Sequence, residues 1–366
     1  MIAQATARRD RLRRQMAATD TDLTVVGPTS HMRWLAGLSP HGDERPVMLF
    51  VSQTYAALLI PALNAESVRQ HTDLPFHTWT DEDGPKGVLA ALLSKTGVGG
   101  SNLSLSIDEA MRADFALLVL DALPGARRRF TDTTVSALRA EKEDDEYRAL
   151  KASALLNDRA VQAGFAALRD GITEAGVAEV IAAVYAEAGA STEFISVCFG
   201  GNGAFPHHHT GSTPLRRNMA VLIDAGARHR GYPSDMTRIG WFGTPGAEFH
   251  KVAAIVEAAV QAALSAAKPG VPAAAVDAAA RGVITKAGYG DLFKHRTGHG
   301  LGIDIHEAPY ITAVSNGLLK ENNVFSIEPG IYLSGEFGIR LEEIVILRSD
   351  GPEILSEMPR HPVIIA

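Results

Sequence analysis

Apolar and polar positions alternate differently in the two halves of the chain. Short apolar runs at residues 23–26, 47–51 and 55–60 predict buried strands, and the segments at 88–93 and 111–123 have helical spacing. Strands that alternate with helices are typical of an α/β domain. This half has neither a phosphate-binding loop nor a cluster with metal-ligand spacing, so we expect no chemistry in it. In the second half, alanine-rich amphipathic helices are predicted at residues 144–170, 174–189, 246–267 and 272–287.

A run of charged residues separates the two halves. It extends from Leu138 to Tyr147, and such runs are typical of a solvated helix face or a connector. We therefore place a domain boundary near residue 140, with an N-terminal α/β domain at 1–135 and a second domain at 140–366.

Composition and charge exclude several classes of partner. The chain has 35 Lys and Arg against 42 Asp and Glu, a net charge of -7, without a basic stripe. We therefore expect neither nucleic acid nor a membrane as a partner. The only cysteine is Cys198, and residues 1–19 are charged without an apolar core typical of a signal peptide. We expect a soluble cytoplasmic protein.

Two histidines stand in the glycine-rich stretch Thr297–Pro309. His299 and His306 are surrounded by three glycines, which disfavour a helix. The pattern predicts a loop that enters a short strand at 301–305 and ends at the proline. Glycine beside histidine permits close approach of the backbone, and neutral imidazole is a common metal ligand. A glycine-rich turn with half-exposed histidines is the alternative.

A first predicted hairpin brings two aspartates together. Apolar runs at 220–224 and 235–242 flank a turn, and a turn centred between residues 229 and 230 places Asp224 opposite Asp235. Opposed side chains in antiparallel strands have Cβ atoms roughly 4.5–5.5 Å apart.

A second predicted hairpin repeats this arrangement with two glutamates. A turn centred on Gly335 opposes Glu328 to Glu342. The two-residue period of a strand then puts Arg340 on the same face as Glu342, and Glu343 on the other face.

Two such pairs of carboxylates favour a common cation site. Two charges ~5 Å apart at an effective dielectric constant near 20 repel each other by roughly 3 kcal/mol. Four carboxylates would be neutralised by two divalent ions. Oxygen ligands with one imidazole favour Mn²⁺, with Co²⁺, Zn²⁺ or Fe²⁺ possible, whereas Mg²⁺ fits less well. Each hairpin alone could instead be a surface turn with acidic strand ends.

The set Asp224, Asp235, His299, Glu328 and Glu342 resembles the five ligands of the pita-bread metallopeptidases, the family of methionine aminopeptidase, aminopeptidase P and prolidase. The small N-terminal α/β domain resembles the Xaa-Pro branch of that family. The motifs that carry the resemblance are Leu222–Gly226, Gly231–Arg238, Thr297–Gly302 with His306–Pro309, Ser326–Tyr332, Gly338–Glu342, and the loop Phe199–His207.

The resemblance implies a fold and an assembly. The fold is a small creatinase/prolidase-like α/β domain followed by a pita-bread domain, in which helices cover a curved, largely antiparallel sheet. The chain would bind two divalent ions, most readily Mn²⁺, and would form a homodimer.

It also implies roles for the five ligands. Asp224 would hold one ion and His299 with Glu328 the other, while Asp235 and Glu342 would bridge them. A bridging hydroxide would attack the peptide bond that precedes a proline in the second position of a small peptide.

Further side chains receive roles from the same resemblance. Glu328 would carry a proton to the leaving prolyl nitrogen. His207 and His306 would stabilise the tetrahedral intermediate and the substrate amide, and His295 would lie by the proline pocket. Arg340 would orient the bridging carboxylates or contact a substrate carboxylate.

The chain departs from the family pattern in two places. His207 is followed by two more histidines, and we select His207 because it directly follows Pro206. Glu343 stands where family members often have aspartate, and we expect it to point away from the ions. Tyr232 and Tyr332 are expected to be packing residues.

The sequence thus predicts an Xaa-Pro aminopeptidase or an Xaa-Pro dipeptidase. The alternative is a non-peptidase hydrolase or lyase that acts on a small metabolite with the same metal scaffold. A non-catalytic binding module is disfavoured because all five ligand positions are filled. Candidates for recognising the free carboxylate of a dipeptide are Arg33, His41 and Arg45.

Overall fold

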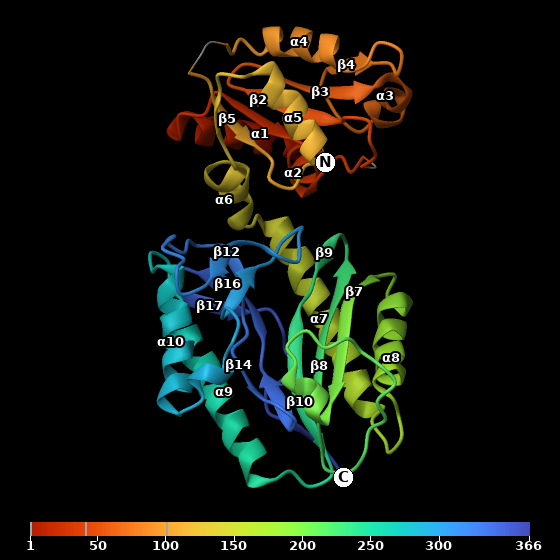
Figure 1. Cartoon of the computed structure of the whole chain (residues 1–366), viewed down its shortest axis with the longest axis vertical. Coiled ribbons are helices and arrows are strands. Elements are labelled where there is room, and N and C mark those ends of the chain that lie inside the picture. The colour runs from red at the N-terminus through yellow and green to blue at the C-terminus, as the bar shows by residue number, and fades with distance from the viewer. Residues whose placement is uncertain (1, 41, 100–101) are drawn as a thin grey trace. The chain divides into compact units, whose positions relative to one another are not determined.

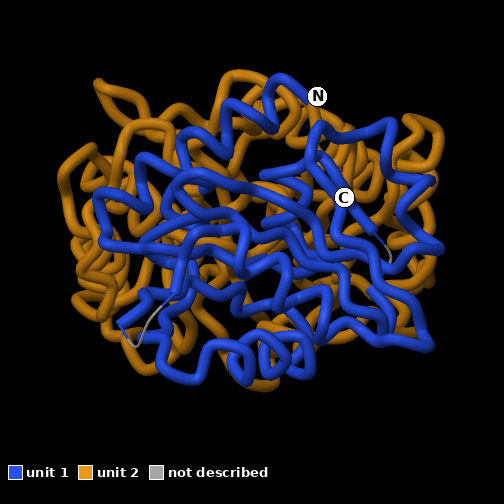
Figure 2. The backbone as a smooth tube through the Cα atoms, turned by 90° about the horizontal axis from the view of Figure 1, so that it is seen from above, with its two compact units in different colours: residues 1–139 blue, residues 140–366 orange. Residues whose placement is uncertain are grey.

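The computed structural model describes residues 2–40, 42–99 and 102–366. The chain divides into two compact units, residues 1–139 and residues 140–366 (Figure 2). Each unit has a hydrophobic core of its own. Within the described part of the chain, no helix has the length and apolarity needed to cross a bilayer.

The first unit is built on a six-stranded mixed sheet with the order β4-β3-β2-β1-β5-β6 (Figure 1). All four residues of its central strand β1 are buried, and this strand pairs antiparallel with β2 and parallel with β5. The strands are β1 (Leu23–Val26), β2 (Met48–Ser52), β3 (Ala56–Pro61), β4 (Phe76–Trp79), β5 (Ser104–Ile107) and β6 (Arg127–Arg129). The helices are α1 (Ile2–Ala18), α2 (Ser30–Ala36), α3 (Ala62–Arg69), α4 (Lys86–Lys95), α5 (Ala113–Ala122) and α6 (Val135–Ala140).

The second unit contains two larger sheets and a two-stranded ribbon. The first sheet has the order β18-β10-β8-β7, with β9 paired to β8; the second has the order β12-β11-β13-β16-β17; and β14 pairs with β15. Apart from the contact of β18 with β10, all these pairings are antiparallel. The strands are β7 (Ser191–Phe199), β8 (Met219–His229), β9 (Tyr232–Pro233), β10 (Met236–Phe242), β11 (Gly298–Gly300), β12 (Glu307–Ile311), β13 (Val324–Ile327), β14 (Gly330–Leu333), β15 (Phe337–Arg340), β16 (Glu343–Arg348), β17 (Gly351–Ile354) and β18 (Val363–Ile365).

Four long helices cover these sheets: α7 (Asp144–Ala166), α8 (Glu174–Glu187), α9 (Ala247–Ala266) and α10 (Ala273–Lys286) (Figure 1). The helices α7 and α8 bury their apolar faces against β7 and β8, while α9 and α10 pack on a second core that includes β13 and β15. The charge run ends in the start of α7, where Glu143 and Glu146 form a reciprocal capping box. The predicted fold, a small α/β domain followed by a largely antiparallel sheet covered by helices, is confirmed.

The two hairpins differ in how well their predicted registers hold. In the second, Gly330 pairs with Arg340 and Ile327 with Glu343, so the register predicted for Glu328 and Glu342 is confirmed. In the first, Asp224 pairs with Thr237, two residues beyond the predicted partner Asp235, so the predicted opposition of the two aspartates is wrong.

The turn of the first hairpin explains this shift. His229 pairs with Tyr232, so the loop consists of Arg230 and Gly231, both with positive φ. Positive φ at both central residues is typical of a type I′ hairpin turn, whose usual sequence is Asn-Gly or Asp-Gly. Because Arg230 stands where Asn or Asp is usual, the sequence does not indicate this turn type.

The glycine-rich stretch is placed differently from the prediction. Gly298 and Gly300 lie in strand β11, whereas Gly302 begins a run of bends at residues 302–306, so the prediction of a strand at 301–305 is wrong. A Cβ on Gly298 would collide with the carbonyl of Ser326, and a Cβ on Gly300 with the carbonyl of Ala308. The glycines thus permit close approach within a sheet rather than a free loop.

Candidate active site

One cavity of about 620 Å³ lies in the second unit. All nine residues predicted to form the site line this cavity: His207, Asp224, Asp235, His295, His299, His306, Glu328, Arg340 and Glu342. The structure therefore brings together side chains from positions 207 to 342 of the sequence.

The four acids reach the cavity from two pairs of antiparallel strands. Asp224 lies in β8, and Asp235 directly precedes β10, the partner of β8. Glu328 follows β13, and Glu342 precedes β16, the partner of β13. Strand pairing thus holds two aspartates on one sheet and two glutamates on the other at positions that face a common space.

His299 faces these acids with one ring nitrogen. Its Nε2 lies 3.3 Å from Glu328 Oε1 and 3.6 Å from Asp235 Oδ2. Its Nδ1 lies 3.1 Å from the carbonyl oxygen of Gly300, which can only accept, so Nδ1 carries the proton. The lone pair of Nε2 therefore points toward the carboxylates, the orientation that a metal ligand requires.

The electrostatics of the acids are those of a cation site. Burial, followed by repulsion from Glu342 and Asp224, raises the pKa of Asp235 well above its usual range. Burial, followed by the charges of Glu328 and Asp224, does the same to the pKa of Glu342. Burial raises the pKa of Glu328 to about 7, while Arg340 opposes that shift.

The unsatisfied oxygens fit a divalent metal. Ligand atoms of Asp235, His299 and Glu342 all lie within 4.8 Å of one another. Within the described part of the chain, Asp224 Oδ1 and Glu342 Oε1 are buried and have no hydrogen-bond partner. Buried carboxylate oxygens without donors are costly unless a cation neutralises them. The residues present therefore suit hard divalent ions with mixed oxygen and imidazole ligation.

We expect the affinity of the site for Mn²⁺ to fall as the pH drops below about 7. Because the pKa of Glu328 is raised to about 7, this carboxyl carries a proton below that pH and must release it to bind a cation. The pKa of His299 is lowered to about 3 by burial and by His306, so its imidazole releases no proton above pH 5. Affinity should fall about tenfold per pH unit for each displaced proton. Titration calorimetry in two buffers with different ionisation enthalpies counts these protons, and binding without proton release would contradict the prediction.

Arg340 binds Asp224, and not Asp235 as predicted. Its Nη2 donates to Asp224 Oδ2 at 2.6 Å, and its Nε donates to Thr237 Oγ1 at 2.9 Å. Thr237 in turn donates to Glu342 Oε2 at 2.9 Å. Arg340 therefore orients Asp224 directly and Glu342 through Thr237, because the observed register places Thr237 beside Asp224.

His295 and Tyr332 form a polar pair at the cavity wall. Burial lowers the pKa of His295 to about 4, so the ring is neutral near pH 7. Its Nδ1 donates to the carbonyl of Arg296 at 2.8 Å, which leaves Nε2 to accept from the Tyr332 hydroxyl at 2.7 Å. Arg340 donates to the same hydroxyl at 2.9 Å. Tyr332 is buried, as expected of a packing residue, and its hydroxyl also has two polar partners that the sequence did not indicate.

His306 stands against the ring of His299, with the ring centroids 4.1 Å apart and the planes nearly perpendicular. The residue after it, Glu307, forms an ion pair of 2.8 Å with Lys142, whose side chain is fully buried. A Cβ on Gly302 would collide with the Glu307 carboxylate. This glycine therefore makes room for the ion pair that anchors the chain beside His306.

His207 and His208 point to different surroundings. His207 lines the cavity, whereas His208 lies 3.0 Å from the fully buried Glu174 at the start of α8. The carboxylate of Glu174 also accepts from the backbone N–H groups of Phe199 (2.8 Å) and Gly211 (3.0 Å) and from the side chain of Asn202 (2.8 Å). Glu174 thus ties together both ends of the loop that carries His207.

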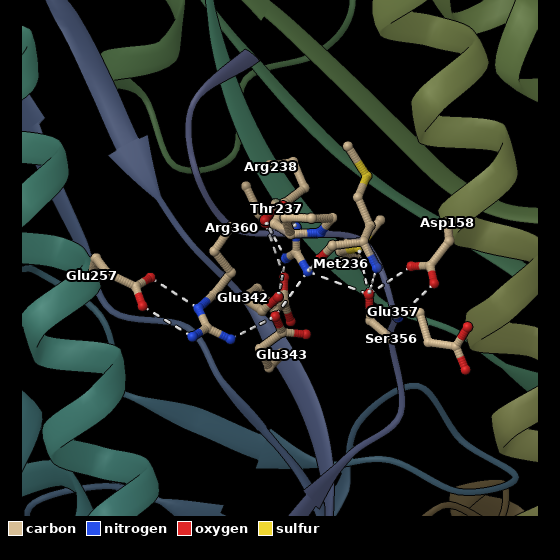
Figure 3. A network of polar contacts seen from close by, with 12 residues as sticks. Asp158, Met236, Thr237, Arg238, Glu257, Glu342, Glu343, Ser356, Glu357 and Arg360 are labelled. Atoms are coloured by element: carbon tan, nitrogen blue, oxygen red, sulfur yellow. Dashed lines mark hydrogen bonds and ion pairs between the residues drawn. The ribbon is translucent and has the colours of Figure 1, made fainter.

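Glu343 faces away from the cavity, as predicted. It forms ion pairs with Arg238 at 2.8 Å and Arg360 at 3.0 Å, and Arg360 also binds Glu257 (Figure 3). Arg238 donates to the backbone carbonyl of Glu342 at 2.6 Å. This buried network fixes the backbone from which Glu342 enters the cavity.

Several cavity residues were not identified from the sequence: Glu193, Phe194, Arg296 and Ile305. Arg296 lies three residues before His299, and only this proximity to a candidate ligand in the sequence could have indicated that it lines the cavity. Of the three candidates for carboxylate recognition, Arg45 forms an ion pair with Asp81, and His41 lies outside the described residues.

Comparison with known proteins gives matches along nearly the whole chain. Residues 8–140 match the Creatinase/Prolidase N-terminal domain, and residues 148–349 match Metallopeptidase family M24. The probable dipeptidase PepE of Mycobacterium bovis is 35% identical over 93% of this chain and 91% of that protein. An Xaa-Pro dipeptidase of Lactobacillus delbrueckii subsp. lactis is 31% identical over 93% of this chain and 94% of its own length. The crystal structure of a prolidase from Thermococcus sibiricus superposes with a TM-score of 0.88 at 33% identity, and the match covers 98% of both chains.

Proposed function

Because the chain belongs to metallopeptidase family M24, we propose that it cleaves the bond between an N-terminal residue and a proline in small peptides. The observation that carries this proposal is the convergence of four carboxylates and His299 on one cavity, with buried oxygens that lack donors. The Xaa-Pro dipeptidase and the prolidase named above support the choice of substrate.

We assign the metal ligands as Asp224, Asp235, His299, Glu328 and Glu342, and Mn²⁺ as the preferred ion. Two divalent cations in this site would lower the pKa of a bound water and polarise the scissile carbonyl. Their number follows from four carboxylates in one cavity, whose charge two such ions balance.

Glu328 is the proposed proton carrier. Its Oε1 lies 3.3 Å from His299 Nε2, among the other assigned ligands, where a carboxylate can take a proton from bound water and pass it to the leaving prolyl nitrogen. Ser326 donates to Glu328 Oε1 at 2.9 Å and so fixes the direction of the carboxylate.

His306 is proposed to act as a neutral donor. Burial, followed by the charges of Arg296 and His207, lowers the pKa of His306, so a ring N–H is available near pH 7 without net charge. Donors placed where negative charge develops on the carbonyl oxygen stabilise the tetrahedral intermediate. We assign this task to His207 and His306, and contact with the proline ring to His295.

A direct assay tests the proposed function. Protein stripped of metal and reloaded with Mn²⁺ is incubated with leucyl-proline, leucyl-prolyl-glycine and leucyl-alanine. Cleavage of either proline peptide, with leucyl-alanine left intact, is the expected result. If neither proline peptide is cleaved although two ions are bound per chain, the proposal fails. The alternative, a hydrolase or lyase that acts on a small metabolite, would then be favoured.

We expect Glu174→Gln to lower kcat about tenfold with little change in KM. Either orientation of the glutamine amide turns its NH₂ group toward two donors of the His207 loop, which leaves buried groups unsatisfied. The substitution should act through His207, so a double-mutant cycle is the decisive measurement. The effect of Glu174→Gln should disappear in a His207→Ala background; equal losses in both backgrounds would show that Glu174 has only a general structural role.

A further inference from the structure

Two arginines line the cavity, and they differ in their partners. Arg340 is engaged by Asp224, Thr237 and Tyr332. Among the residues that the structure describes, the guanidinium of Arg296 has neither a hydrogen bond nor an ion pair, and its contact is the ring of Tyr310, whose centroid lies 5.0 Å away. A permanent positive charge without a counter-ion therefore stands on the wall of a peptide-sized cavity.

The backbone that carries Arg296 is held firmly. Arg281 donates to the carbonyl of His295 at 2.9 Å, and the His295 ring donates to the carbonyl of Arg296 at 2.8 Å. The N–H of Thr297 donates to the carbonyl of Ile311 at 3.0 Å, next to Tyr310 in β12. These contacts fix the base of the side chain and bring the aromatic ring beside it.

The contact with the Tyr310 ring uses none of the guanidinium N–H groups in a hydrogen bond to the described residues. A planar guanidinium over an aromatic face keeps its N–H groups in the plane of the fork, where they match the two oxygens of a carboxylate. Its charge also acts on His299 and His306, so it stands close to the proposed reaction centre.

We infer that Arg296 binds a carboxylate of the substrate and thereby selects the class of peptide that is cleaved. The inference rests on the proposed function and sharpens it. The carboxylate could be the C-terminus of a dipeptide or the side chain of an acidic N-terminal residue. The C-terminus is favoured because His295, the adjacent residue, is the one assigned to the proline ring.

Charge removal at one position tests the inference. Mn²⁺-loaded wild-type and Arg296→Gln protein are assayed on leucyl-proline, leucyl-prolinamide, aspartyl-proline and aspartyl-prolinamide. If the C-terminus is bound, Arg296→Gln should lower kcat/KM for both free acids about 10- to 100-fold, mainly through KM, and change both amides less than twofold. If an acidic first side chain is bound, both aspartyl substrates should lose activity and both leucyl substrates should keep it.

Two further variants separate recognition from general electrostatics. Arg296→Lys retains the charge but not the planar fork, and should retain part of the preference. Lys294→Gln removes one positive charge from an exposed position two residues away that does not line the cavity, and should leave the preference unchanged. Equal losses on all four substrates with Arg296→Gln, or no loss, would overturn the inference.

A binding measurement decides the question without turnover. A leucyl-proline analogue with a reduced, uncleavable bond is titrated as the free acid and as the amide into the Mn²⁺-loaded protein, and so is the matching aspartyl pair. Wild-type protein should bind the free acid more tightly than the amide, whereas the Arg296→Gln protein should bind both with similar affinity. Absence of cleavage by the wild type would reject the proposed function alone, whereas equal binding of carboxylate and amide forms would reject the role of Arg296.

Discussion

Glu328→Gln should lower kcat by about 10²–10⁴-fold or more and leave the fold intact, because one carboxyl is assigned both a ligand's and a proton carrier's role. Glutamine has nearly the same shape and can still accept from Ser326, but it can neither take up nor release a proton. The chain should therefore retain its thermal stability, and turnover on leucyl-proline should be lost even with Mn²⁺ in excess, which offsets the weaker metal binding expected of a neutral ligand.

A control in the same hairpin isolates the chemical effect. Glu336→Gln makes the identical change at an exposed position in the turn between β14 and β15, and should leave kcat within about twofold, as is usual for surface changes. The pH profile of kcat provides a second measurement, since an ionisation that belongs to Glu328 should be absent from any residual activity of the glutamine variant. More than a tenth of the wild-type kcat in Glu328→Gln would remove the proton-carrier role.

The helices and most strands could be predicted because their signals are local. The spacing of apolar residues predicts α8 and α10 within about two residues of their observed ends, an accuracy usual for periodic segments. The register of the second hairpin was predictable because Gly335 adopts a positive φ at the centre of the turn. By contrast, β6 was missed because Arg127–Arg129 is a short polar strand at the edge of the first sheet.

The site could be predicted as a set of residues but not as a network. Acids in or next to apolar, strand-like runs and a histidine flanked by glycines can be recognised in the sequence, and all of them line the same cavity. The contact of Glu174 with His208, which are 34 positions apart, depends on how α8 packs against β7, and no local pattern encodes it. The same holds for Tyr332, whose hydroxyl meets Arg340 across the β14–β15 ribbon and His295 from a distant segment.

The pairing of Asp224 with Thr237 shows how a small error in register changes chemistry. The predicted register would have placed the two aspartates directly opposite each other. The observed register puts Thr237 there, and Thr237 links Arg340 to Glu342. A hydroxyl that accepts from a guanidinium and donates to a carboxylate orients both groups, so hydrogen bonds couple the two hairpins.

His299→Ala should remove at least one of the two metal ions that we propose per chain and lower kcat/KM on leucyl-proline by about 10³-fold or more, since loss of the ion removes the chemistry that it supplies. His299 is the only imidazole in the assigned ligand set, and its ring is fixed by the Gly300 carbonyl with Nε2 toward Asp235 and Glu328. Alanine would leave these carboxylates facing each other without that nitrogen. Their mutual repulsion should then be relieved by protonation instead of by a cation.

Metal analysis after extensive dialysis is the measurement for this variant, with activity as the second readout. His250→Ala, at an exposed position of α9 outside the cavity, is the matched control and should keep both ions. In the His299→Ala protein, Glu328 and Asp235 should retain protons to a higher pH, so excess Mn²⁺ should restore binding better at pH 8 than at pH 6. Two tightly held ions per chain in His299→Ala would exclude His299 from the ligand set and place the metal site among the carboxylates alone.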